Sequence, residues 1–494
     1  MGKLNIAYVA SEAMPYSKTG GLADVAGALP QQLADLKHRV ALFSPLYRTV
    51  KIDRHDIFRV GRFTDLSVWV GGREWRFNLL QRDIAKNNKL ETYFIQCDEL
   101  FDRESLYVDP ATGKDYADNH IRFAFFARAV LLALERLDFK PDIINANDWQ
   151  SALIPAYLKT AERDHPFFKN TKTVLTIHNV AYQGLFEADT FADLGINKSY
   201  YYPTSPFEFW GEVNFLKAGI VFADAINTVS ETYAKEIQSS NEFGYGLEGV
   251  LHDRRAALYG IVNGVDYDTW SPANDKLIAK SYDQDSVADK ATNKLELLKL
   301  AGLGENRFEK PLIGVISRLA DQKGFDLIEE VADELFDLDF TFVLLGTGQE
   351  KYHELFEGLA AKYPERISVN FKFDERLAHL IEAGSDMFLM PSRFEPCGLN
   401  QLYSLRYGTV PIARKTGGLA DTIVDYRQAK AKATGFLFEE YTGEALLSAV
   451  SQALALFEKK KSWLSLMKRG MKQDFSWKKS AKRYVEVYEK ALGV

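Results

Sequence analysis

The sequence has little of what marks secreted, membrane-spanning or nucleic-acid-binding proteins. Among its 494 residues there are two cysteines, Cys97 and Cys397, which excludes a disulfide scaffold and a cysteine-rich zinc module and fits a reducing compartment. The longest apolar stretch, residues 123–134, carries Arg128 and is too short to span a bilayer. No signal-peptide pattern opens the chain, and a formal net charge of −7 provides no overall basic field. We therefore expect a soluble intracellular protein whose partners are neither nucleic acids nor membranes.

Several catalytic signatures are also missing. No G-x-x-x-x-G-K-[ST] run is found, which argues against a P-loop ATPase. Gly346-Thr-Gly348 begins like a dinucleotide fingerprint, but Lys351 stands where the third glycine belongs, which argues against a nicotinamide dehydrogenase. The run HELFE at 353–357 has glutamate where a zinc helix would have its second histidine, so we interpret it as an exposed helix face. No metal site is expected.

Strand-like apolar runs alternate with helical patterns along the whole chain. In the first half the strands are expected at 4–10, 40–43, 92–96, 142–146, 173–178, 225–229 and 258–262, with helices at 21–36, 121–137 and 232–237. A hairpin is expected at 67–70 and 74–79. In the second half the strand signal recurs at 312–317, 341–345, 367–369, 387–391, 410–413 and 435–438. The alternation predicts an α/β protein with parallel sheets covered by helices on both faces.

A polar segment between the halves predicts a domain junction. It opens with N-G-V-D at 263–266, contains Ser271-Pro272 and then becomes highly charged. We expect an N-terminal domain over 1–262, a linker over 263–272 and a C-terminal domain over 273–476. The remaining segment, 477–494, reads as a helix over 477–492.

The heptapeptide K-T-G-G-L-A-D occurs twice, at 18–24 and at 415–421, each time after an expected strand and at the start of an expected helix. Glycines at a helix start let backbone N–H groups approach a phosphate, and the preceding lysines add positive charge. An accidental match or a plain tight turn is the alternative. We interpret the two copies as similar ligand-binding loops, one per domain.

Charged residues follow two strands of the second half. Arg318 and Lys323 emerge after the strand at 312–317, where two cations can hold a diphosphate or form a solvated surface pair. Glu395 lies in the loop after the strand at 387–391, before a helix expected to begin near Gly398, and can bind sugar hydroxyls. Cys397 beside it is expected to be packed, because no base partner is evident.

Polar and aromatic groups follow two strands of the first half. Asp148 and Trp149 end one strand, and His178 and Asn179 end another, so a carboxylate, an aromatic face and an imidazole are expected at one sheet edge. His178 can equally be structural. The segment 200–210 holds six aromatic residues in eleven, which indicates either ordinary packing or contact with pyranose rings.

Taken together, these motifs resemble those of bacterial glycogen synthases and plant-type starch synthases, the ADP-glucose-dependent enzymes of glycosyltransferase family GT5. The resemblance rests on K-T-G-G-L-A-D at 18–24, N-D-W at 147–149, H-N at 178–179, Y-Q-G at 182–184, N-T-V-S at 227–230, N-G-V-D at 263–266, S-R-L-A-D-Q-K-G at 317–324, S-R-F-E-P-C-G-L at 392–399 and T-G-G-L-A-D-T at 416–422.

The resemblance implies a GT-B fold, in which two Rossmann-like domains with parallel sheets face each other across a deep cleft. The final helix would pack back on the N-terminal domain. The implied reaction is transfer of glucose from ADP-glucose to the non-reducing 4-OH of an α-1,4-glucan, with retention of configuration and without a covalent nucleophile. The resemblance further implies that no metal or pyridoxal phosphate cofactor is needed. It implies a cytoplasmic location, or the plastid stroma for a mature plant-type enzyme.

The resemblance also assigns roles by position. Arg318 and Lys323 would bind the diphosphate and stabilise departing ADP, Glu395 would hold the donor glucose, His178 would contact its 6-OH, and Asp148 would position hydroxyls. Further donor contacts would come from Lys18, Gly21, Thr416, Gly417, Gly418, Leu419, Cys397, Gly398 and Tyr403. Acceptor contacts would come from Asp24, Asn179 and Trp149.

The chain departs from related patterns in two places, and three alternatives remain open. Many retaining GT-B enzymes have a second glutamate where this chain has Tyr403, and relatives can carry histidine where this chain has Asn145 and Asn147. The alternatives are a retaining transferase with UDP-glucose or another acceptor, a glucan phosphorylase, which would need a pyridoxal phosphate lysine, and a non-catalytic glucan-binding homologue. Intact Lys18, Arg318, Lys323 and Glu395 argue against the last. Nothing in the sequence indicates an oligomeric state.

Overall fold

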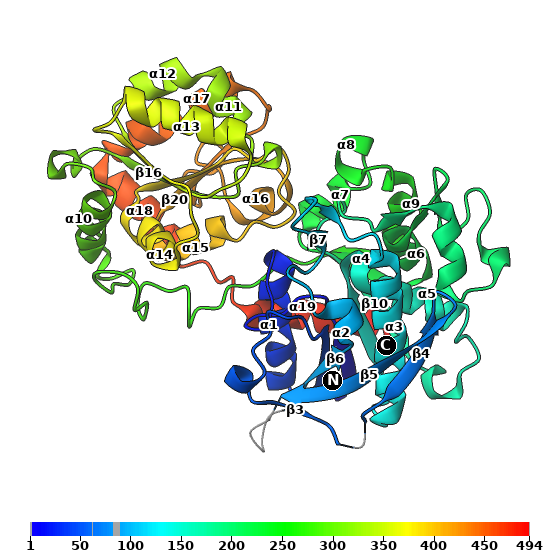
Figure 1. The fold of residues 1–494 in the computed structure, drawn as a ribbon. Coiled ribbons are helices and arrows are strands. Elements are labelled where there is room, and N and C mark those ends of the chain that lie inside the picture. The colour runs from blue at the N-terminus through cyan, green and yellow to red at the C-terminus, as the bar shows by residue number, and fades with distance from the viewer. Residues whose placement is uncertain (1, 62, 83–88, 494) are drawn as a thin grey trace. The chain divides into compact units, whose positions relative to one another are not determined.

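The computed structural model describes residues 2–61, 63–82 and 89–493, and it divides into two compact units. Unit 1 comprises Met1–Val229, Ala234–Ile261 and Trp477–Val494, and unit 2 comprises Ser230–Tyr233 and Val262–Ser476. The segment 263–272, expected as a linker, belongs to the compact part of unit 2. Figure 1 shows the course of the chain within each unit.

Unit 1 is built on a sheet with strand order β15-β14-β10-β9-β1-β2-β6-β5-β3, and β4 pairs with β5. Neighbours from β15 to β6 are parallel, whereas β3, β4 and β5 pair antiparallel. The bounds are β1 Asn5–Val9, β2 Arg39–Pro45, β3 Ile57–Arg59, β4 Leu66–Val70, β5 Arg73–Arg82, β6 Leu90–Gln96, β9 Ile143–Asn147, β10 Lys172–Ile177, β14 Ala225–Thr228 and β15 Leu258–Gly260. The expected hairpin is confirmed, since Val70 pairs with Arg73 across Gly71-Gly72.

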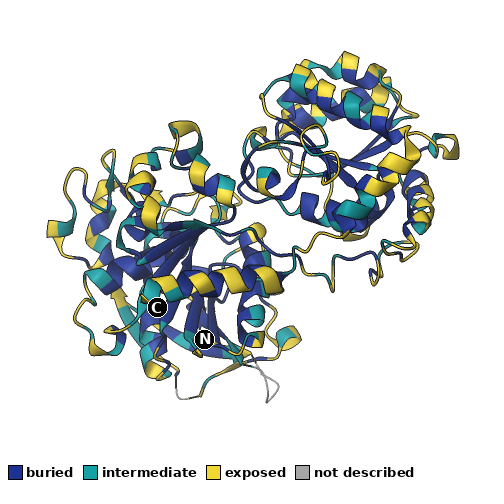
Figure 2. Ribbon diagram, turned by 180° about the vertical axis from the view of Figure 1, so that it is seen from behind, coloured by how far each residue is buried: buried dark blue, intermediate teal, exposed yellow. Residues whose placement is uncertain are grey.

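The parallel strands of this sheet are buried almost throughout, because helices cover them (Figure 2). The principal helices of unit 1 are α1 Gly21–Asp35, α3 Asn119–Arg136, α5 Leu153–Lys159, α6 Phe215–Phe222, α9 Glu248–Asp253 and α19 Trp477–Leu492. A small separate sheet has the order β11-β13-β12, with β11 Leu185–Phe186, β12 Glu208–Phe209 and β13 Glu212–Asn214. Helix α19 presents buried residues at helical spacing, among them Tyr484 and Tyr488, and it contacts α1, β10 and β14 (Figure 1). The last helix of the chain therefore completes the unit that the first half of the chain forms, as expected.

Unit 2 contains a six-stranded parallel sheet with the order β18-β17-β16-β19-β20-β21. Its strands are β16 Leu312–Ile316, β17 Thr341–Leu345, β18 Ile367–Asn370, β19 Met387–Met390, β20 Val410–Arg414 and β21 Phe436–Phe438. Its helices include α10 Lys290–Leu300, α11 Asp326–Glu330, α12 Ala332–Asp337, α13 Glu350–Lys362, α14 Glu375–Gly384, α15 Asn400–Tyr407, α16 Gly417–Thr422, α17 Gly443–Phe457 and α18 Lys460–Met471. Numbered within the unit, the strand order is 3-2-1-4-5-6, which is the Rossmann order.

Both units thus have a point where the strand order reverses, beside β1 in unit 1 and beside β16 in unit 2. Ligands of open α/β sheets bind outside the carboxyl ends of the strands at such a point. One local expectation was wrong: α15 begins at Asn400 rather than near Gly398. Gly398 has φ +72° and belongs to the turn before the helix.

Candidate active site

The expected functional residues fall into two half-sites, one in each unit, at the carboxyl ends of the central strands. In unit 2, the loops after β16 and β19 carry Arg318, Lys323 and Glu395. In unit 1, the loops after β1, β9 and β10 carry Lys18, Asp148 and His178. We call these the unit 2 half-site and the unit 1 half-site and describe each separately.

In the unit 2 half-site, Lys323 and Glu395 form an ion pair across the reversal point. The Lys323 Nζ lies 2.6 Å from the Glu395 Oε2, and the two side chains are 20% and 8% exposed. The Ser392 hydroxyl donates to the same oxygen at 3.1 Å. The pair holds one carboxylate oxygen and leaves Glu395 Oε1 as an acceptor for a ligand.

Arg318 adds a second cation to this half-site. It follows β16 directly, its side chain is exposed, and no ion-pair partner for it is found among residues 2–61, 63–82 and 89–493. A small cavity of about 30 Å³ beside it is lined by Ser317, Lys323 and Ser392. A larger pocket of about 460 Å³ in unit 2, lined by residues such as Tyr267 and Arg406, contains none of the expected site residues. Of the expected site residues, Lys323 lines the small cavity.

The second K-T-G-G-L-A-D segment packs against the loop that carries Glu395. A β-carbon on Gly417 would lie 1.9 Å from the Glu395 carbonyl oxygen, and one on Gly418 would lie 2.0 Å from the Cys397 carbonyl oxygen. The Gly418 N–H donates to the Glu395 carbonyl at 3.1 Å, and Thr416 and Leu419 are buried. These glycines are therefore required for close backbone packing.

Cys397 and Tyr403 both pack against other residues of unit 2. Cys397 is buried, and burial raises the pKa of its thiol to about 12, so it is not a nucleophile at neutral pH. Tyr403 lies in α15, where its ring stacks on Trp270 with centroids 4.1 Å apart. Gly398 adjoins Gln401, whose side chain would lie 2.4 Å from an added β-carbon.

In the unit 1 half-site, the first K-T-G-G-L-A-D segment is held by Glu12, which the sequence analysis did not identify. The Glu12 carboxylate is buried and accepts hydrogen bonds from the Thr19 N–H, the Thr19 hydroxyl and the Gly20 N–H. Among the described atoms, none lies within 4 Å of a β-carbon built on Gly20 or Gly21. Lys18 and Asp24 pair at 2.7 Å on the exposed side.

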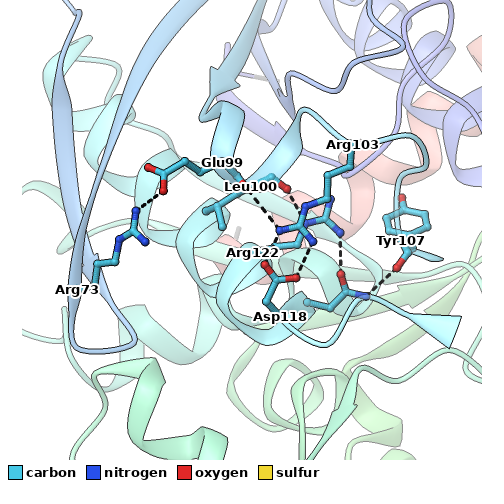
Figure 3. A network of polar contacts seen from close by, with 8 residues as sticks. Arg73, Glu99, Leu100, Arg103, Tyr107, Asp118 and Arg122 are labelled. Atoms are coloured by element: carbon cyan, nitrogen blue, oxygen red, sulfur yellow. Dashed lines mark hydrogen bonds and ion pairs between the residues drawn. The ribbon is translucent and has the colours of Figure 1, made fainter. Parts of the chain in front are cut away.

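A polar network that includes Tyr107 and Arg122 (Figure 3) reaches Glu12 through the Tyr107 hydroxyl. The Tyr107 hydroxyl donates to Glu12 Oε1 at 2.9 Å, and the Tyr107 carbonyl accepts from the Asn119 amide at 3.1 Å. Asn119 in turn accepts from the fully buried Arg122 at 2.7 Å. Burial lowers the pKa of Arg122. The network fixes the position of the loop at 18–20 through Glu12.

Asp148 occupies a strained position at the end of β9. Its φ is +52°, in the left-handed region that favours glycine and asparagine. Burial raises the pKa of its carboxyl to about 7, although the backbone N–H groups of His178 and Asn179 donate to it and lower the value. Strain and a raised pKa at a strand end are features of functional carboxylates.

Trp149 was expected to expose its aromatic face to a ligand at the sheet edge, but its indole is buried. Its indole is 6% exposed and packs against Phe123 and Phe215, and Gly184 lies close to its ring. It belongs to the core beneath the half-site.

His178 is held in one neutral tautomer by Asn147. The Asn147 amide nitrogen donates to the Val9 carbonyl at 2.9 Å, so its Oδ1 is the acceptor for both the Tyr8 hydroxyl and the His178 Nε2, each at 3.0 Å. The proton therefore lies on Nε2, and Nδ1 is left as an acceptor. Burial lowers the pKa of His178 to about 3, so the ring is neutral at ordinary pH.

Asn179 completes the unit 1 half-site. Its Oδ1 accepts from the Ala181 N–H at 3.0 Å, and its carbonyl accepts from the Tyr182 N–H at 3.2 Å. The sequence analysis did not identify Glu12, and it assigned no positioning role to Asn147 or Ser392, which lie within its motifs. A glutamate directly after a buried strand was the available signal for Glu12, but its partners Thr19 and Tyr107 become visible only in the fold.

The comparisons with known proteins agree with this architecture. The family described as "Starch synthase catalytic domain" matches residues 5–253, and the family "Glycosyl transferases group 1" matches residues 304–465. The glycogen synthase of Koribacter versatilis is 48% identical over 492 residues, and that of Geotalea uraniireducens is 47% identical over 492 residues, each covering 99% of both chains.

Solved structures show the same likeness. The catalytic domain of starch synthase IV from Arabidopsis thaliana, bound to ADP and acarbose, superimposes with a TM-score of 0.89 at 31% identity over 100% of both chains. The sucrose-phosphate synthase of Thermosynechococcus elongatus shares the fold, with a TM-score of 0.59 at 16% identity over 99% of both chains.

The fold and the two half-sites define a GT-B glycosyltransferase, as expected from the motifs. The chain belongs to the glycogen synthase and starch synthase family, whose members transfer glucosyl groups to glucans. Among the described residues, no helix is long and apolar enough to cross a membrane, and no group of three or more metal-binding side chains gathers.

Proposed function

We propose that this enzyme transfers glucose from ADP-glucose to the non-reducing 4-OH of an α-1,4-glucan with retention of configuration. The observation that carries the donor assignment is the Lys323–Glu395 pair at the strand reversal of unit 2, beside the exposed Arg318. Cations at this place match a nucleoside diphosphate, and the similar catalytic domain of starch synthase IV is bound to ADP.

The two cations act on the leaving group in this proposal. Arg318 and Lys323 bind the diphosphate and offset the charge that develops on departing ADP. Glu395 binds donor glucose hydroxyls through Oε1, while Oε2 keeps Lys323 in place. The same-face attack of the acceptor 4-OH then passes its proton to the leaving phosphate, so that no protein nucleophile is required.

In this proposal, residues of the unit 1 half-site form hydrogen bonds with hydroxyl groups of the donor and the acceptor. His178 accepts a hydrogen bond from the donor 6-OH at Nδ1, because its Nε2 donates to Asn147. Asp148, Asn179 and Asp24 position donor or acceptor hydroxyls, and Lys18 and Gly21 contact phosphate. Gly417 and Gly418 act indirectly, by allowing the Glu395 loop its close packing.

The proposal includes no metal and no pyridoxal phosphate. Lys323 and Arg318 supply the positive charge that a metal ion supplies in other phosphate-transfer sites. A cytoplasmic location is also proposed, supported by two free, buried cysteines, which suit a reducing compartment.

The test is nucleotide release with glycogen as primer, comparing ADP-glucose with UDP-glucose in the presence of EDTA. Primer-dependent ADP release in EDTA is expected. Preferential UDP release would overturn the donor assignment, and activity that requires an added metal would overturn the cofactor assignment. An Arg318→Gln variant is the companion measurement, with an expected loss of about 100-fold in kcat.

A further inference from the structure

A tryptophan stands at the tip of a hairpin in unit 1 where the backbone disfavours it. Strands β12 Glu208–Phe209 and β13 Glu212–Asn214 pair through Phe209 and Glu212, which leaves Trp210 and Gly211 as a two-residue turn. Their φ angles are +53° and +89°, as a type I′ turn requires, and asparagine is the favoured residue at the first position. Trp210 is nonetheless 86% exposed.

The same arrangement occurs in a neighbouring loop. Tyr245 and Gly246 have φ angles of +52° and +86°, and the Tyr245 side chain is 37% exposed. The two loops touch, since a β-carbon on Gly246 would lie 2.7 Å from the Phe209 ring. An aromatic residue thus precedes a glycine in a left-handed turn at two adjacent places.

A third exposed aromatic residue connects these loops to the unit 1 half-site. Tyr182 is 54% exposed, and its N–H donates to the carbonyl of Asn179. The next residue, Gln183, donates to the Tyr245 carbonyl at 3.0 Å and accepts from Asn214 at 2.7 Å. We call Tyr182, Trp210 and Tyr245 the exposed aromatic set.

Local packing does not account for the Trp210 ring. Within the aromatic segment 200–210, Phe207 is fully buried, and Tyr201 stacks on Phe191 with centroids 4.9 Å apart. These residues supply the local core. Among the described residues, the Trp210 ring contacts one other aromatic ring, that of Phe209, with centroids 6.4 Å apart. A large exposed ring in an unfavourable backbone conformation indicates a ligand.

We propose that the exposed aromatic set binds outer glucose units of the α-glucan acceptor. Aromatic faces stack on the apolar faces of pyranose rings, and the set begins three residues beyond Asn179, which the proposed function places at the acceptor. Glu208, Glu212 and Glu248 lie beside the loops, which disfavours an anionic partner. This proposal rests on the proposed function for the identity of the glucan.

The experiment replaces Trp210 by asparagine, the residue that suits its backbone. Trp210→Asn is compared with Trp69→Thr, which removes another exposed tryptophan (63% exposed) from β4. The KM for glycogen and for maltotriose is measured for the parent and both variants, together with the melting temperature. Trp210→Asn is expected to raise the KM for glycogen about three- to ten-fold. The kcat and the melting temperature should not fall and the KM for maltotriose should not rise, and Trp69→Thr should change none of these values.

Three results would overturn the proposal. The first is an unchanged KM for glycogen in Trp210→Asn. The second is a lower melting temperature together with a raised KM for maltotriose, which would make the ring structural. The third is a change in oligomeric state with unchanged glycogen affinity, which would make the set a protein contact. Glycogen affinity electrophoresis of the same variants separates this proposal from the proposed function, because it reports binding even where no nucleotide sugar is turned over.

Discussion

The two K-T-G-G-L-A-D segments have the same seven residues but different surroundings. In unit 1, β-carbons on Gly20 and Gly21 would meet no described atom within 4 Å, whereas in unit 2 those on Gly417 and Gly418 would collide with backbone carbonyls. The space beside the first pair of glycines is open. The second pair leaves room for the loop that holds Glu395. Identical sequence therefore leaves open space beside its glycines in one unit and makes a packing contact in the other.

The flanking charges differ in the same way. Lys18 pairs with Asp24 inside its own segment, whereas Lys415 pairs with Glu439 after β21. The unit 1 loop is secured by the buried Glu12, and the unit 2 loop by backbone contacts to residues 395–397. The structural role of the glycines is therefore determined by the residues that surround each segment and not by the sequence of the segment itself.

The largest expected effect on stability comes from replacing one glycine of each K-T-G-G-L-A-D segment by alanine. Gly418→Ala should destabilise the protein by about 3 kcal/mol, because the new β-carbon meets the Cys397 backbone. Gly21→Ala should leave stability within about 1 kcal/mol of the parent, since space is open and alanine favours a helix. Denaturant unfolding checks both. Equal destabilisation by the two substitutions would show that the glycines have the same role.

The next effect concerns one carboxylate that contacts each segment, Glu12 in unit 1 and Glu439 in unit 2. Glu12→Gln should cost about 2 kcal/mol, because a buried acceptor of several hydrogen bonds becomes partly a donor. Glu439→Gln should cost less than about 0.5 kcal/mol, because the Lys415–Glu439 pair is exposed. The comparison would fail if calorimetry found both variants equally stable.

The unit 1 half-site also carries a pH dependence through Asp148. Burial raises its folded-state pKa from 3.8 to about 7, so its contribution to stability is complete below pH 4 and is lost as the pH rises through 7. His178 acts in the opposite direction, since burial lowers its pKa from 6.5 to about 3 and its contribution is lost as the pH falls. Asp148→Asn removes only the first contribution, and asparagine tolerates the left-handed φ.

Relative to the parent, Asp148→Asn should therefore gain stability between pH 4 and 7, by at most about 1.4 kcal/mol per pH unit. Unfolding measured at pH 5, 6, 7 and 8 gives this difference. A difference that does not vary with pH would show that Asp148 titrates normally.

The smallest expected change in stability comes from the two lysines. Lys18→Gln and Lys415→Gln should each stay within about 0.5 kcal/mol of the parent, because both ion pairs are exposed. Their activities should differ: only Lys18→Gln should slow turnover, by about tenfold or more, if Lys18 contacts phosphate. Equal rates for the two variants would remove Lys18 from the site.

The sequence predicted the fold well where a periodic pattern is strong. The expected helix at 477–492 matches α19, and every strand expected around the central strands is present within a few residues. The start of α15 was misplaced, because Gly398 and Pro396 form a turn that delays the helix to Asn400. Local sequence does not contain the contacts that decide such boundaries.

The sequence was enough to nominate residues for the candidate site, but it did not indicate which of them interact with one another. The Lys323–Glu395 pair joins residues 72 positions apart, and Glu12 is secured by Tyr107 from 95 positions away. Spacing along the chain says nothing about such pairs. Trp149 illustrates the converse, because its position at a strand end did not reveal that its indole is buried.

Helix α19 has a consequence for how the enzyme is made. Its Tyr488 hydroxyl donates to Asn145 on β9 at 2.7 Å, two residues before Asn147 and three before Asp148. The ribosome completes β9 early, yet the helix that supports it is the last segment to be synthesised. Any chain that ends prematurely, even one that already contains the whole of unit 2, lacks the support of its first half-site. Completion of synthesis is thereby a condition for completing unit 1.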